Sequence, residues 1–400
     1  MMDLTISRRI VQLAPDIEVV ERKGRGHPDT LSDGLAEHLS SNYCRYTIEE
    51  FGSILNHNFD KVGLLGGQSE AKLGKGRMLR PVRVLLNGRA ADGFAGQDIP
   101  LRMLLIGWAT EFLVRELPRL DAERDLEFHF NVSSANTPGY PSNDFAPGGD
   151  SDLRQLQELR SSDTAVVCAQ YPPTALEAAV LAIEEMLTSD PLRQRWPWIG
   201  SDIKVLAWRS GNTVSMTACV PEIADEVADL EAYRANLAEV RNLVEQKTAE
   251  VLPGHHVELH LNTLDDEAGE SLYLTVVGSC VESGDEGLVG RGNRPSGVIA
   301  PLRPHSGEAA CGKNPAFFPG KIYNAAAAEI ARLLHDETGH VIEVWLTAQE
   351  GRPIDDPWQV VVFHDGEPLP GKDVERVVHE VLGRLPDLTE AMINGEIRLW

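Results

Sequence analysis

The side chains of this chain that could carry chemistry gather first in Glu21–Asp33, which reads ERKGRGHPDTLSD. Two glycines in this stretch let the backbone approach a ligand closely. Its basic donors are Lys23, Arg25 and His27. Asp29 and Asp33 follow at the start of an expected helix, where an aspartate is often a cap. The alternative is that Asp29 binds a divalent cation while the basic side chains bind an anion.

A second patch, 284–321, combines glycines with basic residues. From Gly287 to Lys321 the one acidic residue is Glu308. The basic residues of this patch are Arg291, Arg294, Arg303, Lys313 and Lys321. Backbone amides beside cationic side chains are typical of phosphate sites, although the patch fits neither a P-loop nor a GxGxxG motif. A flexible basic surface loop is the alternative, but the prolines of the patch favour a defined shape.

Two shorter elements are weaker candidates. Asp202 and Lys204 lie two residues apart on an expected strand, so they share one face and could address one ligand or form an exposed ion pair. The run Gly66-Gly67-Gln68 is either a strand end or the wall of a small-molecule pocket.

Composition restricts the partners. With 37 Lys and Arg against 61 Asp and Glu, the net charge is −24, so most of the surface repels nucleic acid. An anionic substrate therefore needs a local cluster of positive charge. The sequence shows no membrane helix and no signal peptide, and its five cysteines are scattered without a CxxC spacing. We expect a cytoplasmic protein with reduced thiols and with neither a membrane nor a nucleic-acid partner.

Hydrophobic periodicity predicts alternating helices and strands. Expected helices span 29–50, 101–117, 174–187, 224–250, 322–335 and 372–384. Expected strands span 62–68, 82–86, 126–132, 341–347 and 359–364, with hairpins at 203–218 and 257–276. The polar segment 69–80 is expected to be a loop.

Because a hairpin followed by a helix recurs about three times, the predicted fold class is α+β, with related β-hairpin/helix subdomains. We place the first subdomain at 1–125. The second, 126–250, contains a variable loop at 133–152, and the third, 251–400, contains the basic glycine-rich patch. Strands are expected to be shared between them.

Several separated motifs together resemble the archaeal-type S-adenosylmethionine synthetases (methionine adenosyltransferases). They are ERKGRGHPDT followed by SDG, NHNFDKVGLLGGQ, DIKV at 202–205, LTVVGSCVESGDEGLVGRGNR at 274–294, and GKNP followed by GKIYN. The resemblance implies three subdomains in a pseudo-threefold arrangement and a homodimer with active sites at its interface. It also implies formation of S-adenosylmethionine from ATP and methionine with release of phosphate and pyrophosphate. The implied cofactor is Mg²⁺, and K⁺ is a further candidate.

The resemblance also implies roles for individual residues. Catalytic roles fall to His27, Lys204, Arg291, Lys313 and Lys321. ATP-binding roles fall to Asp163, Asp202, Asp285, Asn293 and Asn314. Gln68 is the candidate for methionine binding, and Asp29 and Asp33 are the candidates for metal binding.

The chain departs from the family pattern in segments expected to border adenosine and methionine. The family's NDTSFGVGYAP reads SDTAVVCAQYPP here, GQGSMDL is replaced by SSANTPGYPSND at 133–144, and FGGG becomes LGKG at 73–76. The first histidine of the family's HHN is Asn56. These departures leave two alternatives open, namely an enzyme on the same scaffold with another thioether or nucleotide, and a non-catalytic regulatory homologue.

Overall fold

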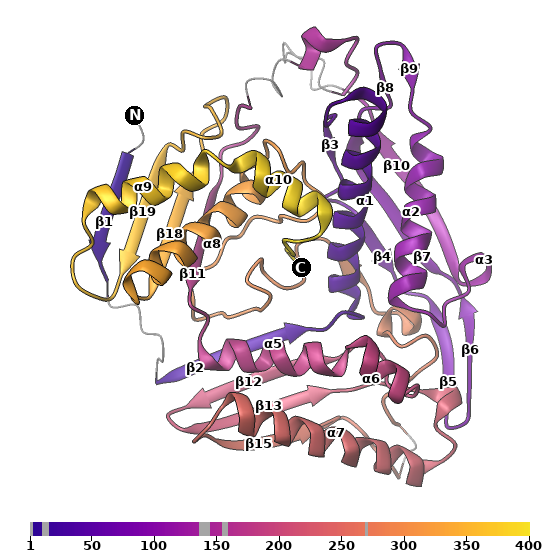
Figure 1. The fold of residues 1–400 in the computed structure, drawn as a ribbon. Helices are drawn as coiled ribbons and strands as arrows, with labels where there is room; N and C mark the ends of the chain where they lie inside the picture. Colours follow the sequence, from indigo (N-terminus) through magenta and orange to yellow (C-terminus); the bar gives the residue numbers. More distant parts are fainter. Residues whose placement is uncertain (1–2, 10–15, 136–144, 154–158, 269–270) are drawn as a thin grey trace.

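The computed structural model describes residues 3–9, 16–135, 145–153, 159–268 and 271–400, and it combines helices with several small sheets (Figure 1). The predicted α+β class is confirmed. Three hydrophobic clusters form the core, and each joins a sheet to the helices that pack on it. The pseudo-threefold relation of the subdomains and their boundaries stay predictions.

The first cluster lies between helices α1 and α2 and the sheet β10-β7-β4-β17, with β3 paired to β7. Helix α1 begins at Pro28, which has no N–H to leave unsatisfied, and it ends before Gly52 in the left-handed conformation with φ 72°. The bounds are α1 Pro28–Phe51, β3 His57–Asn58, β4 Gly63–Leu65, β7 Val82–Ala90, α2 Leu101–Glu116, β10 Leu126–Ser133 and β17 Gly287–Leu288.

The second cluster lies between α5, α7 and the sheet β15-β13-β12-β2. Helix α5 starts with a capping box, in which Thr174 and Glu177 each bond the other's backbone N–H. The bounds are β2 Ile17–Lys23, α5 Ala175–Leu187, α6 Asp190–Arg195, β12 Lys204–Ser210, β13 Thr213–Cys219, α7 Leu230–Val251 and β15 His256–Leu261.

The third cluster lies between α8, α9, α10 and the sheet β1-β19-β18-β11. The bounds are β1 Asp3–Arg8, β11 Val166–Tyr171, α8 Pro319–Thr338, β18 Ile342–Thr347, β19 Gln359–His364, α9 Gly371–Leu382 and α10 Leu385–Asn394. Figure 1 shows β1, from the start of the chain, beside β19 from near its end, and the two strands run parallel. Strand β17 likewise joins a sheet built mostly from residues before 134. The three units therefore interleave along the chain.

Several expected elements were wrong in detail. Residues 69–80 form most of a hairpin of β5 (Gln68–Lys72) and β6 (Lys75–Arg80) rather than a loop, because an exposed two-stranded ribbon carries no apolar alternation. The hairpin expected at 257–276 does not form. Strand β15 instead pairs with β13, and β16 (Leu274–Thr275) pairs with β14 (Glu222–Ile223).

Helix α7 starts at Leu230 rather than at 224, because the Asp229 carboxylate accepts the Ala232 N–H and caps it there. The strand expected at 62–68 covers 63–65 alone. Sequence periodicity also missed β1, β2, β11, α6 and α10. The expected loop at 133–152 lies partly outside the described residues. Smaller described elements include β8 Gly93–Phe94, β9 Gln97–Asp98 and α3 Ala122–Asp125.

In the parts of the chain that the structure describes, no helix is long and apolar enough to cross a membrane. All five cysteines are free thiols.

Candidate active site

The N-terminus of α1 carries the first group of candidate residues. His27 is the cap of this helix, and its Nδ1 accepts the Asp29 N–H at 3.2 Å. Burial lowers the pKa of His27 to about 4, and the nearby Lys23 and Lys204 lower it further against the opposing effect of Asp29. The ring is therefore neutral at pH 7, and its acceptor Nδ1 assigns the remaining hydrogen to Nε2.

Asp29 lies between a cation and a backbone amide. Its Oδ2 contacts Lys23 Nζ at 2.8 Å, and its Oδ1 accepts the Leu288 N–H at 3.1 Å. The same ammonium donates to the Arg291 carbonyl at 2.7 Å. Asp29 and Lys23 therefore hold the basic glycine-rich patch to the start of α1.

Asp33, one turn further along α1, serves the same purpose. Its Oδ1 accepts the Gly290 N–H at 2.7 Å, and its Oδ2 lies 2.2 Å from the position that a Cβ on Gly292 would take. Burial raises the pKa of Asp33 to about 7 against the opposing hydrogen bonds from Gly290 and Gly292. In this structure the carboxyl group of Asp33 anchors the backbone of the patch.

Glu37 lies four residues beyond Asp33, hence on the same face of α1. Its carboxylate accepts the Gly312 N–H at 3.1 Å and pairs with Lys321 Nζ at 2.7 Å. We call Asp29, Asp33 and Glu37 the carboxylate ladder of α1. Together they hold 288–321 against one helix. Sequence reasoning missed Glu37, and the four-residue spacing after Asp29 and Asp33 is the signal that could have indicated it.

Lys313 and its neighbours form the second group of candidate residues. Lys313 Nζ contacts Asp60 Oδ2 at 2.9 Å and lies 4.2 Å from the centre of the Phe318 ring. Lys321 is only 1% exposed, and its ammonium donates to the Lys313 carbonyl at 2.9 Å. Asn314 is buried and bonds the Leu55 carbonyl at 3.3 Å. Lys313 is thus the side chain of this group placed to meet a ligand, while Lys321 and Asn314 support it from inside.

Asp202 and Lys204 reach the first group from β12. Asp202 is buried, its Oδ2 accepts the Cys280 N–H at 2.9 Å, and burial raises its pKa to about 7. Lys204 Nζ lies 3.3 Å from Glu21 Oε1 on the neighbouring strand. Exposed Asp285 is close enough to act electrostatically on both His27 and Asp202, so these three residues lie around one site.

The remaining candidates differ in position. Asn293 clamps Lys23 by accepting its N–H at 3.0 Å and donating to its carbonyl at 2.8 Å. Gln68 is exposed at the start of β5, where Gly66 packs closely on Gly284, next to Asp285. Asp163 is exposed and accepts the Thr164 N–H at 2.7 Å. It lies near the second group, because the Ser162 N–H bonds the Phe317 carbonyl at 3.1 Å.

Within the described ranges, no group of three or more His, Cys, Asp or Glu could hold a metal ion. The proposed cofactor, Mg²⁺, is usually bound by proteins through one or two carboxylates together with substrate phosphates. Asp29 lies beside the basic patch, and its Oδ2 contacts a side-chain cation, the Lys23 ammonium, that a metal ion could replace, whereas both oxygens of Asp33 face backbone amides. We therefore place the metal proposal on Asp29.

Comparison with known proteins identifies the family to which this fold and these motifs belong. Residues 5–396 match the S-adenosylmethionine synthetase (AdoMet synthetase) family. The chain is 36% identical to the S-adenosylmethionine synthase of Hyperthermus butylicus over 404 residues, covering 96% of this chain and 95% of that protein. It is 35% identical to that of Methanoregula boonei, with coverages of 96% and 95%.

A solved structure has a similar fold. It is described as an unusual S-adenosylmethionine synthetase from Campylobacter jejuni, with a TM-score of 0.61 at 13% identity, covering 93% of this chain and 88% of that one. The chain belongs to the S-adenosylmethionine synthetase family, as its motifs predicted.

Proposed function

We propose that this chain transfers the adenosyl group of ATP to the sulfur of methionine, and then hydrolyses the released triphosphate to pyrophosphate and phosphate. The family match over nearly the whole chain supports this proposal. The observation that carries it is the arrangement on α1, where neutral His27 lies beside Asp29 and the carboxylate ladder holds the basic patch on the same helix.

The proposed chemistry needs no nucleophile from the protein, because a thioether sulfur attacks carbon C5′ of ATP directly. The protein instead orients the two substrates in line and stabilises the charge of the leaving triphosphate. His27 would donate its Nε2–H to the oxygen that leaves C5′. Arg291 and Lys313 would bind the phosphates, with Lys204 approaching from β12 and Asp202 and Asp285 placing the nucleoside.

Mg²⁺, when bound, would neutralise phosphate charge, and Asp29 would hold it together with the phosphates. Lys23 pairs with Asp29 at 2.8 Å and is therefore positioned to contact the same phosphates. K⁺ stays a candidate cofactor.

We further propose a homodimer with the site at its interface. Lys204 shares the helix-free face of β12 with Leu206 and Trp208, which are 41% and 53% exposed. A second copy covering this face would bury these apolar side chains and enclose the site. Light scattering of the purified protein tests this, and a monomer at micromolar concentration would contradict it.

A cytoplasmic location is proposed on composition alone.

The decisive experiment is to incubate the purified protein with ATP, Mg²⁺ and methionine and to identify the products by mass spectrometry. We expect S-adenosylmethionine, pyrophosphate and phosphate in equal amounts. Phosphate products without S-adenosylmethionine would contradict the assignment, and no turnover at all would favour the non-catalytic homologue.

A second candidate, an altered thioether or nucleotide, rests on β11. This strand holds buried Val167 and half-buried Ala169 where the family pattern has glycines. Replacing 164–172 by the family-like TSFGVGYAP should raise methionine turnover if this segment limits the substrate. A wild-type kcat near about 10 s⁻¹ with methionine would instead exclude this candidate.

A further inference from the structure

A cavity of about 550 Å³ lies between β11, α5 and α8 and is closed by the segment 294–306 and the C-terminal segment 397–399. Its size falls within the range of small-molecule pockets, roughly 300–1,000 Å³. The cavity shares part of β11 with the segment that the family pattern places near the substrates, but none of the residues assigned individually above to ATP, methionine or metal binding lines it.

The walls of the cavity are largely apolar. Leu181 of α5, Val298, and Ile397 and Leu399 of the C-terminal segment line it, together with alanines from β11, α5 and α8. The small side chains leave room for a compact ring system or a short alkyl chain. Burying such a body would contribute roughly 25 cal/mol per Å² of apolar surface.

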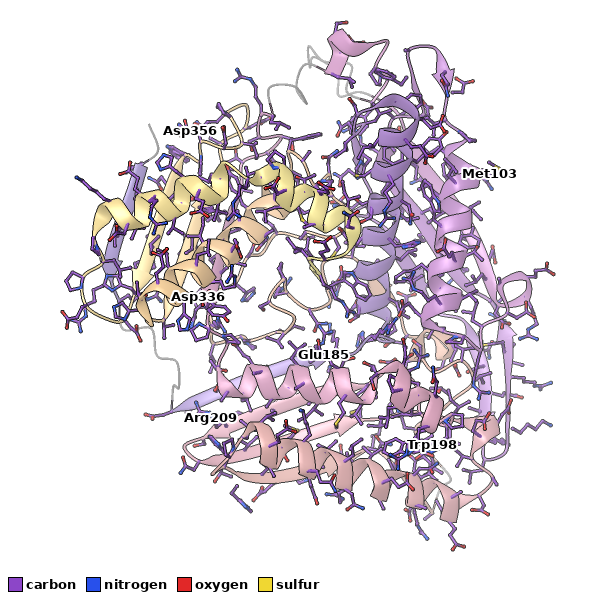
Figure 2. The ribbon with its side chains drawn as sticks, in the orientation of Figure 1. Met103, Glu185, Trp198, Arg209, Asp336 and Asp356 are labelled. Atoms are coloured by element: carbon purple, nitrogen blue, oxygen red, sulfur yellow. The ribbon has the colours of Figure 1, made fainter. Side chains whose placement is uncertain are left out.

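The charged groups of the cavity leave an excess of positive charge. Four arginines and three glutamates line it. Arg303 is paired with Glu177, and Arg332 Nη2 lies 2.9 Å from Glu329. Two arginines of the lining, Arg294 and Arg398, stand outside these pairs, and exposed Glu185 is the one lining glutamate left to balance their charge. Glu185 lies on the side of α5 that faces the centre of the molecule (Figure 2).

Arg294 carries an unused donor. Its Nη1 donates to the Gly290 carbonyl at 3.2 Å, but its Nε–H is buried and has no hydrogen-bond partner in the described part of the chain. A buried donor without a partner is unfavourable, and an anionic oxygen would satisfy it with a strong charge-assisted bond. Arg398 adds a second guanidinium, whose Cζ lies 4.0 Å from the Trp400 ring centre and on which Glu184 and Glu116 act electrostatically from outside the cavity lining.

We propose that this cavity binds an amphipathic anion, with a compact apolar body carrying one carboxylate or sulfonate that contacts Arg294 and Arg398. Arg294 also bonds the Gly290 carbonyl, so the bound anion would be linked through Arg294 to the turn that Asp33 anchors on α1.

The test uses the full-length protein and the fluorescent sulfonate 8-anilinonaphthalene-1-sulfonate. We expect one probe per chain, displaced by decanoate but not by decylamine. Arg294→Gln and Arg398→Gln should each weaken binding by roughly tenfold, the scale of one lost charge-assisted hydrogen bond. Ala328→Phe fills the cavity from exposed Ala328 on α8 and should abolish binding, whereas Ala238→Phe on the exposed surface of α7 should leave it unchanged.

Three results would overturn the proposal. Unchanged probe affinity in Ala328→Phe would place the probe elsewhere. Equal displacement by decylamine and decanoate would remove the role of the arginines. Displacement by ATP with simple competition would make the cavity part of the nucleotide site rather than a separate one. Because the readout is binding, it stays informative even if the proposed activity is not found.

Discussion

The Asp33 carboxylate accepts the N–H of Gly290 at 2.7 Å, although 257 residues separate the two in sequence. This bond lies at the middle of the carboxylate ladder, between the contacts of Asp29 with Leu288 and of Glu37 with Gly312. The basic patch thus takes its shape from α1, a helix more than 230 residues away in sequence.

The raised pKa of Asp33 makes its contribution to stability depend on pH. With a folded-state pKa of about 7 against an ordinary value of 3.8, the native state binds the proton more tightly than the unfolded chain. Its contribution is therefore complete below pH 4 and is lost as the pH rises to about 7. Asp33→Asn cannot titrate, so the free energy of unfolding of the wild type relative to this variant should fall by about 2–4 kcal/mol over that range. Urea unfolding of both proteins at pH 4.5 and pH 8 measures this difference, and a constant difference would contradict the assigned pKa.

Lys313 and Arg291 should be needed for turnover. Arg291 is exposed, and Lys313 lies half-buried beside Asp60. Loss of one preorganised charge donor typically costs about 10²-fold in kcat. Lys313→Ala and Arg291→Ala should reach this scale in the product assay, whereas Lys372→Ala, an exposed lysine on α9, should behave as wild type. Near-normal turnover in both variants would show that the basic patch does not bind the phosphates.

Chelation should abolish turnover, and added Mg²⁺ should restore it. Asp29→Asn should lower the apparent affinity for Mg²⁺ by at least about tenfold, because a carboxylate and the phosphates together make the hard oxygen site. A titration of activity against Mg²⁺ compares this variant with Asp98→Asn, which changes an exposed aspartate of β9. Full activity in the presence of EDTA would show that the metal is dispensable.

Lys321 should matter first for stability. Its ammonium is buried against Glu37, and removal of one partner of a buried pair costs about 3–5 kcal/mol. Lys321→Met should therefore lower the free energy of unfolding by this amount, and Lys321→Met with Glu37→Leu should be less destabilised than the sum of the single changes. Strict additivity of the two changes would contradict the pairing of Lys321 with Glu37. A Lys321→Met protein that is as stable as wild type but inactive would indicate that Lys321 contacts the triphosphate directly.

The sequence predicted the elements whose apolar residues repeat clearly. Leu31, Leu35 and Leu39 are fully buried on α1, and the 203–218 hairpin forms as β12 and β13. Strand β2 was missed because charged Glu18 and Arg22 share its buried face with Val20, and both are buried by ion pairs with distant Arg209 and Glu184. No local pattern reveals such pairs.

The sequence predicted which residues belong to the candidate site, but not which of them support the backbone and which face a ligand. Asp29, Asp33 and Lys321 all occur in the recognised motifs. Only the three-dimensional structure shows that Asp33 bonds backbone amides and that Lys321 pairs inside the protein. Glu37 was not predicted to take part, because its partners Gly312 and Lys321 lie 275 and 284 residues later in the chain.

The addition of β17 as the edge strand of the first sheet affects how the protein folds during its synthesis. Core residues Val277 and Val281 pack with α1, so the N-terminal unit is incomplete until about three quarters of the chain has left the ribosome. During synthesis the carboxylate ladder of α1 is therefore without its partners until residues 288–321 have been made. We therefore expect nascent chains shorter than about 290 residues to be captured by chaperones and sensitive to protease, with protection gained abruptly once the glycine-rich segment emerges.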